Sequence, residues 1–238
     1  MNNTARGASL VLLLIVMGLP YIPIRAATLV DFSTSFGSFE IQLYDDLTPV
    51  TVANFLYYVQ NKLYDNTIIH RSIPGFVIQG GAYQLSGNSL FQVPSGAPIV
   101  NEPGISNIRG TVAMAKVSGD PNSATSQWFF NLADNSSNLD HQNGGFTVFG
   151  EVVGSGMSVV DAIASVPTYN ASPNLGGDFS NLPLLSPSLQ AQNLVMINSV
   201  SVVPEPSINA LLCVGLLSLS VTTLLRIMSR GVNGILIS

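Results

Sequence analysis

The chain has 238 residues, enough for one domain of ordinary size with further segments at its ends. Hydrophobic residues make up 47% of it and charged residues only 9%, and its single cysteine excludes an internal disulfide bond. Residues 27–203 carry four basic and twelve acidic side chains, a net charge of −8, which argues against nucleic acid as a partner.

The first predicted element is a secretory signal peptide over residues 1–26. Arg6 precedes an apolar run from Ala8 to Leu19, and the small-residue pair Ala26-Ala27 follows. A charged start, an apolar middle and a small-residue end are typical of such a leader. The apolar run is shorter than the roughly 20 residues of a membrane span. The alternative is an uncleaved membrane anchor.

Two strands and a helix are predicted next. Apolar and polar residues roughly alternate over 28–44, which indicates strands with a hairpin turn at Gly37. Thr48 and Pro49 then predict a helix start, with Thr48 as the capping side chain and Pro49 in the first turn. Apolar side chains recur at helical spacing after them, and we expect the helix to end near Asn61.

Residues 69–81, IHRSIPGFVIQGG, gather the side chains of a candidate site. Arg71 precedes two apolar residues, Phe76 and Val77, and one amide, Gln79. Val77 and Gln79 share a face of an extended strand, and the Pro-Gly pair lets the chain turn after Arg71. The stretch predicts a small apolar surface with one cation and one amide at its edge. It offers no charged acid or base of the kind that hydrolysis usually needs.

Later segments continue the predominance of strands. Further strands are expected at 110–116, 127–132, 146–153 and 194–203, and a second helix at 157–166. A long surface loop is expected over 83–98 and an irregular insertion over 168–192, because both are rich in small and turn-forming residues. Many strands with two helices fit a closed antiparallel sheet plugged by helices.

The strand at 127–132 has two different faces. Gln127 and Phe129 share one face, while Trp128 and Phe130 share the other. One pair can line a site while the other fills the core, and we place Trp128 in the core.

Three motifs, in this order, resemble those of the cyclophilin-type peptidyl-prolyl cis-trans isomerases. They are HRSIPGFVIQGG at 70–81, GTVAMAK with SATSQWFFNLADN at 110–116 and 123–135, and LDHQNGGFTVFGEVV at 139–153. The resemblance extends from about residue 28 to 203, and the second and third motifs are closest to bacterial exported members. It implies a mainly β fold, a closed eight-stranded antiparallel β-barrel capped by two α-helices, one over each open end.

The resemblance also implies roles for ten residues. Arg71 falls on the catalytic arginine, and Gln79 on the amide that supports it. The other eight fall on substrate-binding positions: Phe76, Val77, Phe129 and Leu139 on the proline pocket, Gln127 on a second amide, Ala115 and Lys116 on backbone that pairs with the substrate, and Phe146 on the pocket rim.

Three positions depart from the family pattern. Val77 replaces a common methionine, Asn138 a common aromatic residue, and Phe146 a common histidine at the rim. We expect a changed ligand preference. Binding of cyclic-peptide inhibitors such as cyclosporin should be weaker, because Asn138 offers little apolar area.

The implied activity is rotation about X-Pro peptide bonds in proline-containing polypeptides. It needs no metal and no cofactor, and His70 and His141 are too few to form a convincing metal site. We expect a monomer. The alternative is a weakly active barrel that binds proline-containing segments as a scaffold module at the cell envelope. A hydrolase would need a nucleophile–base pair, and none is recognisable.

The C-terminal residues 204–238 predict a tether. Pro204-Glu205-Pro206 precedes an apolar run from Ile208 to Leu225, and Arg226 and Arg230 follow. Eighteen helical residues span about 27 Å, enough for a bilayer core, and the arginines orient the barrel outside the cytoplasm. This order resembles the PEP-CTERM sorting signal of Gram-negative bacteria, which the protease exosortase is thought to process. The alternative is a simple single-span anchor. An exported protein is expected, in the periplasm or cell envelope, membrane-anchored or sorted to the outer surface.

Overall fold

The computed structural model describes residues 27–204. The predicted signal peptide, the apolar run at 208–225 and the single cysteine lie outside the described residues. Between residues 27 and 204, none of the helices combines the length and the hydropathy that crossing a membrane requires.

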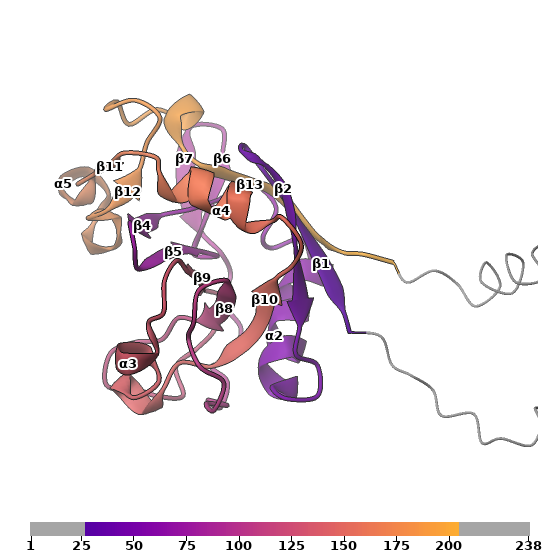
Figure 1. Ribbon diagram of the computed structural model, residues 1–238. Helices are drawn as coiled ribbons and strands as arrows, with labels where there is room; N and C mark the ends of the chain where they lie inside the picture. Colours follow the sequence, from indigo (N-terminus) through magenta and orange to yellow (C-terminus); the bar gives the residue numbers. More distant parts are fainter. Residues whose placement is uncertain (1–26, 205–238) are drawn as a thin grey trace, which may run out of the picture.

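One strongly curled antiparallel sheet dominates the molecule (Figure 1). Its strands are hydrogen-bonded in the order β4-β5-β9-β8-β10-β2-β1-β13-β3-β6-β7. Their bounds are β1 Leu29–Thr34, β2 Gly37–Leu43, β3 Thr67–Ile68, β4 Arg71–Ile73, β5 Val77–Gly80, β6 Tyr83–Ser86, β7 Ser89–Gln92, β8 Thr111–Met114, β9 Trp128–Asn131, β10 Val148–Val152 and β13 Met196–Val202.

The sheet returns to the segment on which it starts. β3 and β4 are successive parts of residues 67–73, which pair with β13 through β3 and with β5 through β4. If residues 67–73 are counted as one strand, the sheet from β4 to β3 contains eight strands, and its last strand is the same segment as its first. This confirms the expected mainly β architecture of eight antiparallel strands, to which the β6–β7 hairpin is added.

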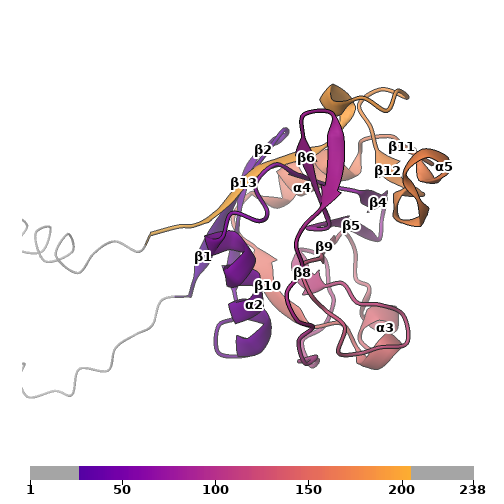
Figure 2. The same cartoon turned by 180° about the vertical axis from the view of Figure 1, so that it is seen from behind.

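Two longer helices lie at opposite ends of the curled sheet. In both views α4 lies above the middle strands and α2 below them (Figures 1 and 2). The helices are α2 Pro49–Gln60, α3 Ser136–Leu139, α4 Met157–Ala164 and α5 Ser172–Leu175, with short 3-10 turns at Gln142–Gly144, Gly177–Phe179 and Ala191–Asn193. The two long helices begin and end within a few residues of the predicted bounds.

The capping of α2 differs from the prediction. Thr48 and Pro49 occupy the expected positions, but the Thr48 side chain makes no capping hydrogen bond. The carboxylate of Glu102 accepts instead from the backbone N–H groups of Val50 and Thr51, at 3.2 and 2.8 Å. A negative charge at a helix start satisfies open donors and interacts well with the helix dipole.

Strand β9 separates two apolar layers, as its alternation predicts. Trp128 and Phe130 are fully buried in the main core, and their rings lie 5.2 Å apart, centre to centre. Phe129 points the other way, into a smaller apolar cluster with Val77 and Leu139. One face of β9 thus packs in the barrel core, and the other face contributes to the smaller apolar cluster.

Two segments predicted as irregular are more ordered than expected. Residues 83–92 form the β6–β7 hairpin, whose turn contains Gly87 at φ +59°. The insertion at 168–192 forms a small ladder of β11 (Thr168–Tyr169) and β12 (Leu182–Pro183). Both segments contribute to one apolar cluster, which their loop-like composition did not predict. Its members include Leu85, Leu90, Phe179, Leu182 and Leu184.

Candidate active site

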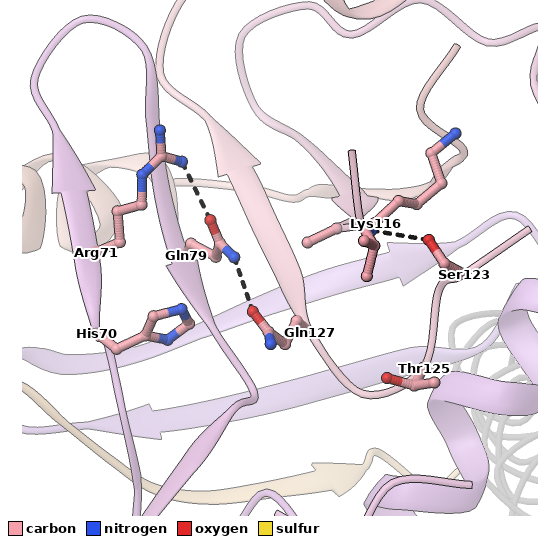
Figure 3. A pocket seen from close by; sticks show the side chains of 9 residues that line it. His70, Arg71, Gln79, Lys116, Ser123, Thr125 and Gln127 are labelled. Carbon is pink, nitrogen blue, oxygen red and sulfur yellow. Dashed lines mark hydrogen bonds between the residues drawn. The ribbon is translucent and has the colours of Figure 1, made fainter. Parts of the chain in front are cut away.

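Arg71 lies on β4 directly opposite Gln79 on β5. Arg71 Nη1 donates to Gln79 Oε1 at 3.1 Å, and Gln79 Nε2 donates to Gln127 Oε1 at 2.9 Å. Figure 3 shows these three side chains in one row across neighbouring strands. The antiparallel register therefore turns two separate sequence motifs into a single hydrogen-bonded chain that ends at the guanidinium.

The insertion supports the strand that carries Arg71. Ser72 N–H, on the edge of β4 away from β5, donates to the carbonyl of Asn181 at 2.9 Å. The buried ring of Phe179 lies 6.4 Å from that of His70, which precedes Arg71. β4 is thus held on both edges, by β5 and by the insertion.

The electrostatic setting of Arg71 favours its use as a donor. Burial lowers the pKa of Arg71, but an arginine remains protonated throughout the physiological range. Of the described residues that line the two cavities beside it, none is acidic. The guanidinium is half-buried, held by a neutral amide and not neutralised by a carboxylate in either cavity.

An apolar cavity of about 210 Å³ opens next to Arg71. Gln79 lies with Arg71 on its polar side, and Phe129 contributes to its apolar lining. The rings of Phe129 and Phe146 meet edge to face, with centres 5.7 Å apart. The size and lining suit one small apolar ring. The remaining apolar side chains around it are Phe76, Val77 and Leu139.

A second, polar cavity of about 340 Å³ adjoins the first. The two share Arg71, Gln79, Ala115 and Lys116, so they form one continuous depression. Gln127 lines the polar part (Figure 3). An extended ligand can therefore place an apolar group in one cavity and polar groups in the other.

All ten predicted site residues line one or both cavities. The prediction missed His70, Val117, Ser123 and Thr125 in the polar cavity and Gln142 at the apolar one. Alternation could have revealed two of these, because Ser123, Thr125 and Gln127 are spaced by two residues.

The rim differs from the expectation. Asn138 is exposed and lines neither cavity, whereas Gln142 lines the apolar one. The short helix α3 ends at Leu139, whose buried side chain reaches the pocket, and its neighbour Asn138 points elsewhere. Asn138 is therefore not part of the wall that a ligand in the apolar cavity would contact.

The described residues contain no cluster of three or more His, Cys, Asp or Glu side chains that could hold a metal ion. The chemistry that the depression can perform is that of the fixed guanidinium of Arg71 beside an apolar cavity. It can bind a neutral ring and stabilise negative charge or a lone pair that develops next to it.

Comparison with known proteins agrees with this geometry. The family model for cyclophilin type peptidyl-prolyl cis-trans isomerase/CLD matches residues 29–177. The peptidyl-prolyl cis-trans isomerase of Acinetobacter baylyi is 47% identical over 146 residues, which cover 60% of this chain and 75% of that protein. Peptidyl-prolyl cis-trans isomerase A of Dickeya dadantii is 39% identical over 180 residues, 74% of this chain and 89% of that protein.

A solved structure supports the fold. The crystal structure of a cyclophilin type peptidyl-prolyl cis-trans isomerase of Cryptosporidium parvum aligns with a TM-score of 0.55 and 22% identity. The alignment covers 76% of this chain and all of that one. A second structure of that protein, in the presence of the dipeptide Ala-Pro, gives a TM-score of 0.53 at 22% identity.

Proposed function

Because the chain belongs to the cyclophilin-type peptidyl-prolyl cis-trans isomerases and is an enzyme of that type, we propose that Arg71 is its catalytic residue and Gln79 the amide that holds it. The observation that carries this proposal is the half-buried guanidinium, fixed by Gln79 at 3.1 Å beside the apolar cavity. The apolar cavity takes the proline ring, and the polar cavity takes the preceding part of the substrate.

The mechanism follows from the peptide bond. Resonance imposes a rotation barrier of about 18–20 kcal/mol, and uncatalysed X-Pro exchange takes roughly tens to hundreds of seconds. Twisting the C–N bond localises a lone pair on the prolyl nitrogen. A guanidinium that donates to this nitrogen stabilises the twisted state more than the planar one, which lowers the barrier.

The surrounding residues serve this step. The cavity walls anchor the ring and exclude water, which strengthens the contact of Arg71 with the nitrogen. The backbone at Ala115 and Lys116 pairs with the backbone of the substrate, and Gln127 binds it with a second amide. The reaction breaks no covalent bond, so a nucleophile has no step to perform. The solved relative that was crystallised with Ala-Pro supports this substrate class.

Replacement of Arg71 tests the site. We expect Arg71→Ala to lower kcat/KM by about 10²–10³, since loss of one donor to a transition state costs roughly 2.7–4 kcal/mol. The assay follows cis-to-trans conversion of a prolyl peptide. Arg109→Ala is the matched control, because Arg109 is exposed, pairs with Asp161 and lines neither cavity. Near-normal turnover of a folded Arg71→Ala protein would overturn the proposal.

We also propose that the enzyme acts on exported proteins and assists their folding. The supporting patterns are the leader-like residues 1–26 and the tether-like residues 204–238, read as an anchor or a sorting signal. Strands β1 and β13 are paired at the point where the domain begins and ends, with Val203 N–H donating to Leu29 O at 2.8 Å. This point lies on the far side of the sheet from β4 and β5 (Figure 1).

With this geometry, a tether leaves the substrate site facing away from the membrane. We expect the full chain to fractionate with membranes or to be trimmed near Pro204. Deletion of 204–238 should release a soluble, active domain. Intact full-length protein in the soluble fraction would contradict both the anchor and the sorting signal.

A further inference from the structure

The loop that precedes β10 turns through residues with positive φ. Asn143, Gly144 and Gly145 are consecutive left-handed residues, with φ values of +52°, +76° and +75°. Glycine adopts positive φ freely and asparagine does so more readily than most residues, so the sequence itself favours this turn, and contacts from outside the loop add to it. Phe146 follows directly and lines the apolar cavity. The conformation of the loop therefore determines where one wall of the cavity lies.

The ammonium group of Lys116 meets this loop from the end of β8. Lys116 Nζ donates to the carbonyl of Asn143 at 2.9 Å and to that of Gly145 at 2.6 Å. It also lies 4.8 Å from the centre of the Phe146 ring, within range of a cation–π interaction. In Figure 3 the side chain extends away from Arg71. One charge thus contacts both the loop backbone and the ring.

The same loop has further ties, and the carbonyl of Phe146 itself accepts from Asn107 Nδ2 at 3.1 Å. Asn101 Nδ2 donates to the carbonyls of Gly144 and Gly145, each at 2.9 Å. Asn143 Nδ2 donates to the carbonyl of Val117 at 2.9 Å. These contacts fix the backbone but do not touch the Phe146 ring. Removal of the lysine charge should leave the loop in place and release mainly the ring.

We infer that Lys116 is a positioning residue, whose ammonium group holds Phe146 against Phe129 and so closes the pocket around the proline ring. The inference rests on the proposed use of this cavity for proline. It gives Lys116 a side-chain function in addition to the backbone pairing with substrate. Because Arg71 and Gln79 do not contact the lysine side chain, ring binding depends on it and the rotation step does not.

The test separates KM from kcat. We expect Lys116→Met, which keeps the apolar stem and removes the charge, to raise KM for a prolyl peptide about three- to ten-fold, with kcat within about two-fold. Lys116→Arg keeps a cation and should restore most of the affinity. Lys62→Met is the matched control, since Lys62 is the other lysine of the chain and is exposed at the end of α2.

A double-mutant cycle provides the second measurement. Phe146→Leu should raise KM on its own, and Lys116→Met should add little to it, because the lysine acts through the ring. Lys116→Gln, which keeps a donor without charge, replaces Lys116→Met in the assay if circular dichroism shows that the methionine variant is unfolded.

Three results would overturn the inference: an unchanged KM in folded Lys116→Met, a fall in kcat at constant KM, or effects of Lys116→Met and Phe146→Leu that simply add. The Arg71→Ala protein, assayed beside these variants, separates two failures. If Arg71→Ala is inactive and Lys116→Met behaves as wild type, the site stands and the positioning role is wrong. If Arg71→Ala is active, the proposed site itself is wrong.

Discussion

Arg71 is held by the neutral amide of Gln79, across neighbouring strands, through a hydrogen bond of 3.1 Å. Gln79 is held in turn by Gln127 at 2.9 Å. A carboxylate in the place of Gln79 would bind the guanidinium more strongly, but it would offset the charge that the proposed mechanism directs at the prolyl nitrogen. An amide chain orients the cation and leaves its charge available.

Replacement of Gln79 tests this arrangement. We expect Gln79→Ala to lower kcat/KM about ten-fold, because the guanidinium loses its orientation but keeps its charge. Combining it with Arg71→Ala should add little, since the amide acts through the arginine. The measurement is the isomerisation assay on both single variants and the double variant, with Gln60→Ala on exposed helix surface as the control. Losses in kcat/KM that add in the double variant would contradict an action of Gln79 through Arg71.

The start of helix α2 provides a second test, on stability. Glu102→Ala should lower the free energy of unfolding by about 1–2 kcal/mol, because the N–H groups of Val50 and Thr51 lose their acceptor. Thr48→Val should cost less than Glu102→Ala, because the buried Thr48 hydroxyl makes no capping bond and only a long hydrogen bond, of 3.5 Å, to the carbonyl of Tyr44. Urea unfolding of both variants shows which of the two substitutions lowers the free energy of unfolding more. A larger loss for Thr48→Val would restore the capping role that the sequence predicts.

Gly80, the last residue of β5, and Gly81, which follows it, make room for Trp128, the only tryptophan of the sequence. A Cβ atom on Gly80 would lie 2.6 Å from Cη2 of Trp128, a rigid and fully buried ring. We expect Gly80→Ala to destabilise the fold by about 1–3 kcal/mol through overpacking. Gly177→Ala is the control, since a Cβ there meets nothing within 4 Å. Thermal unfolding of both proteins gives the comparison, and equal melting temperatures would show that the core adapts.

Asp140 makes stability depend on pH. Burial raises the pKa of its carboxyl, but hydrogen bonds from Asn107, at 2.8 and 3.0 Å, and from Ser106 outweigh this and leave the pKa below its usual value of 3.8. The lower folded-state pKa means that this contribution is fully present above the unfolded value and is lost as pH falls through the folded one.

The corresponding variant is Asp140→Asn. It should lower the free energy of unfolding by at most about 1 kcal/mol at pH 7, and by less at an acidic pH below 3.8, where the contribution of the charged carboxyl is being lost. Denaturant unfolding at the two pH values measures the difference. If the variant is less stable than the wild type by the same free energy at both pH values, the loss comes from altered packing and not from the lost charge.

The sequence by itself determined most strands of the barrel and ten of the residues that line the candidate site, but not the β6–β7 hairpin or the β11–β12 ladder. Period-two alternation is a local property, so it correctly separated Trp128 and Phe130 in the core from Phe129 at the cavity. The motif around Arg71 contains its own turn, which is why its neighbours Phe76, Val77 and Gln79 were placed correctly. Alternation and turns depend on residues that are close together in the chain, so a single sequence is enough to predict them.

Only the tertiary structure decided the contacts between distant segments. Glu102 caps a helix 51 residues earlier in the chain, Gln79 reaches Gln127 across 48 residues, and Lys116 reaches the Phe146 loop across 27 and 29. Each of these donors or acceptors has many possible partners at the level of sequence. The curvature and register of the closed sheet select one, because a one-residue shift would turn every side chain to the other face.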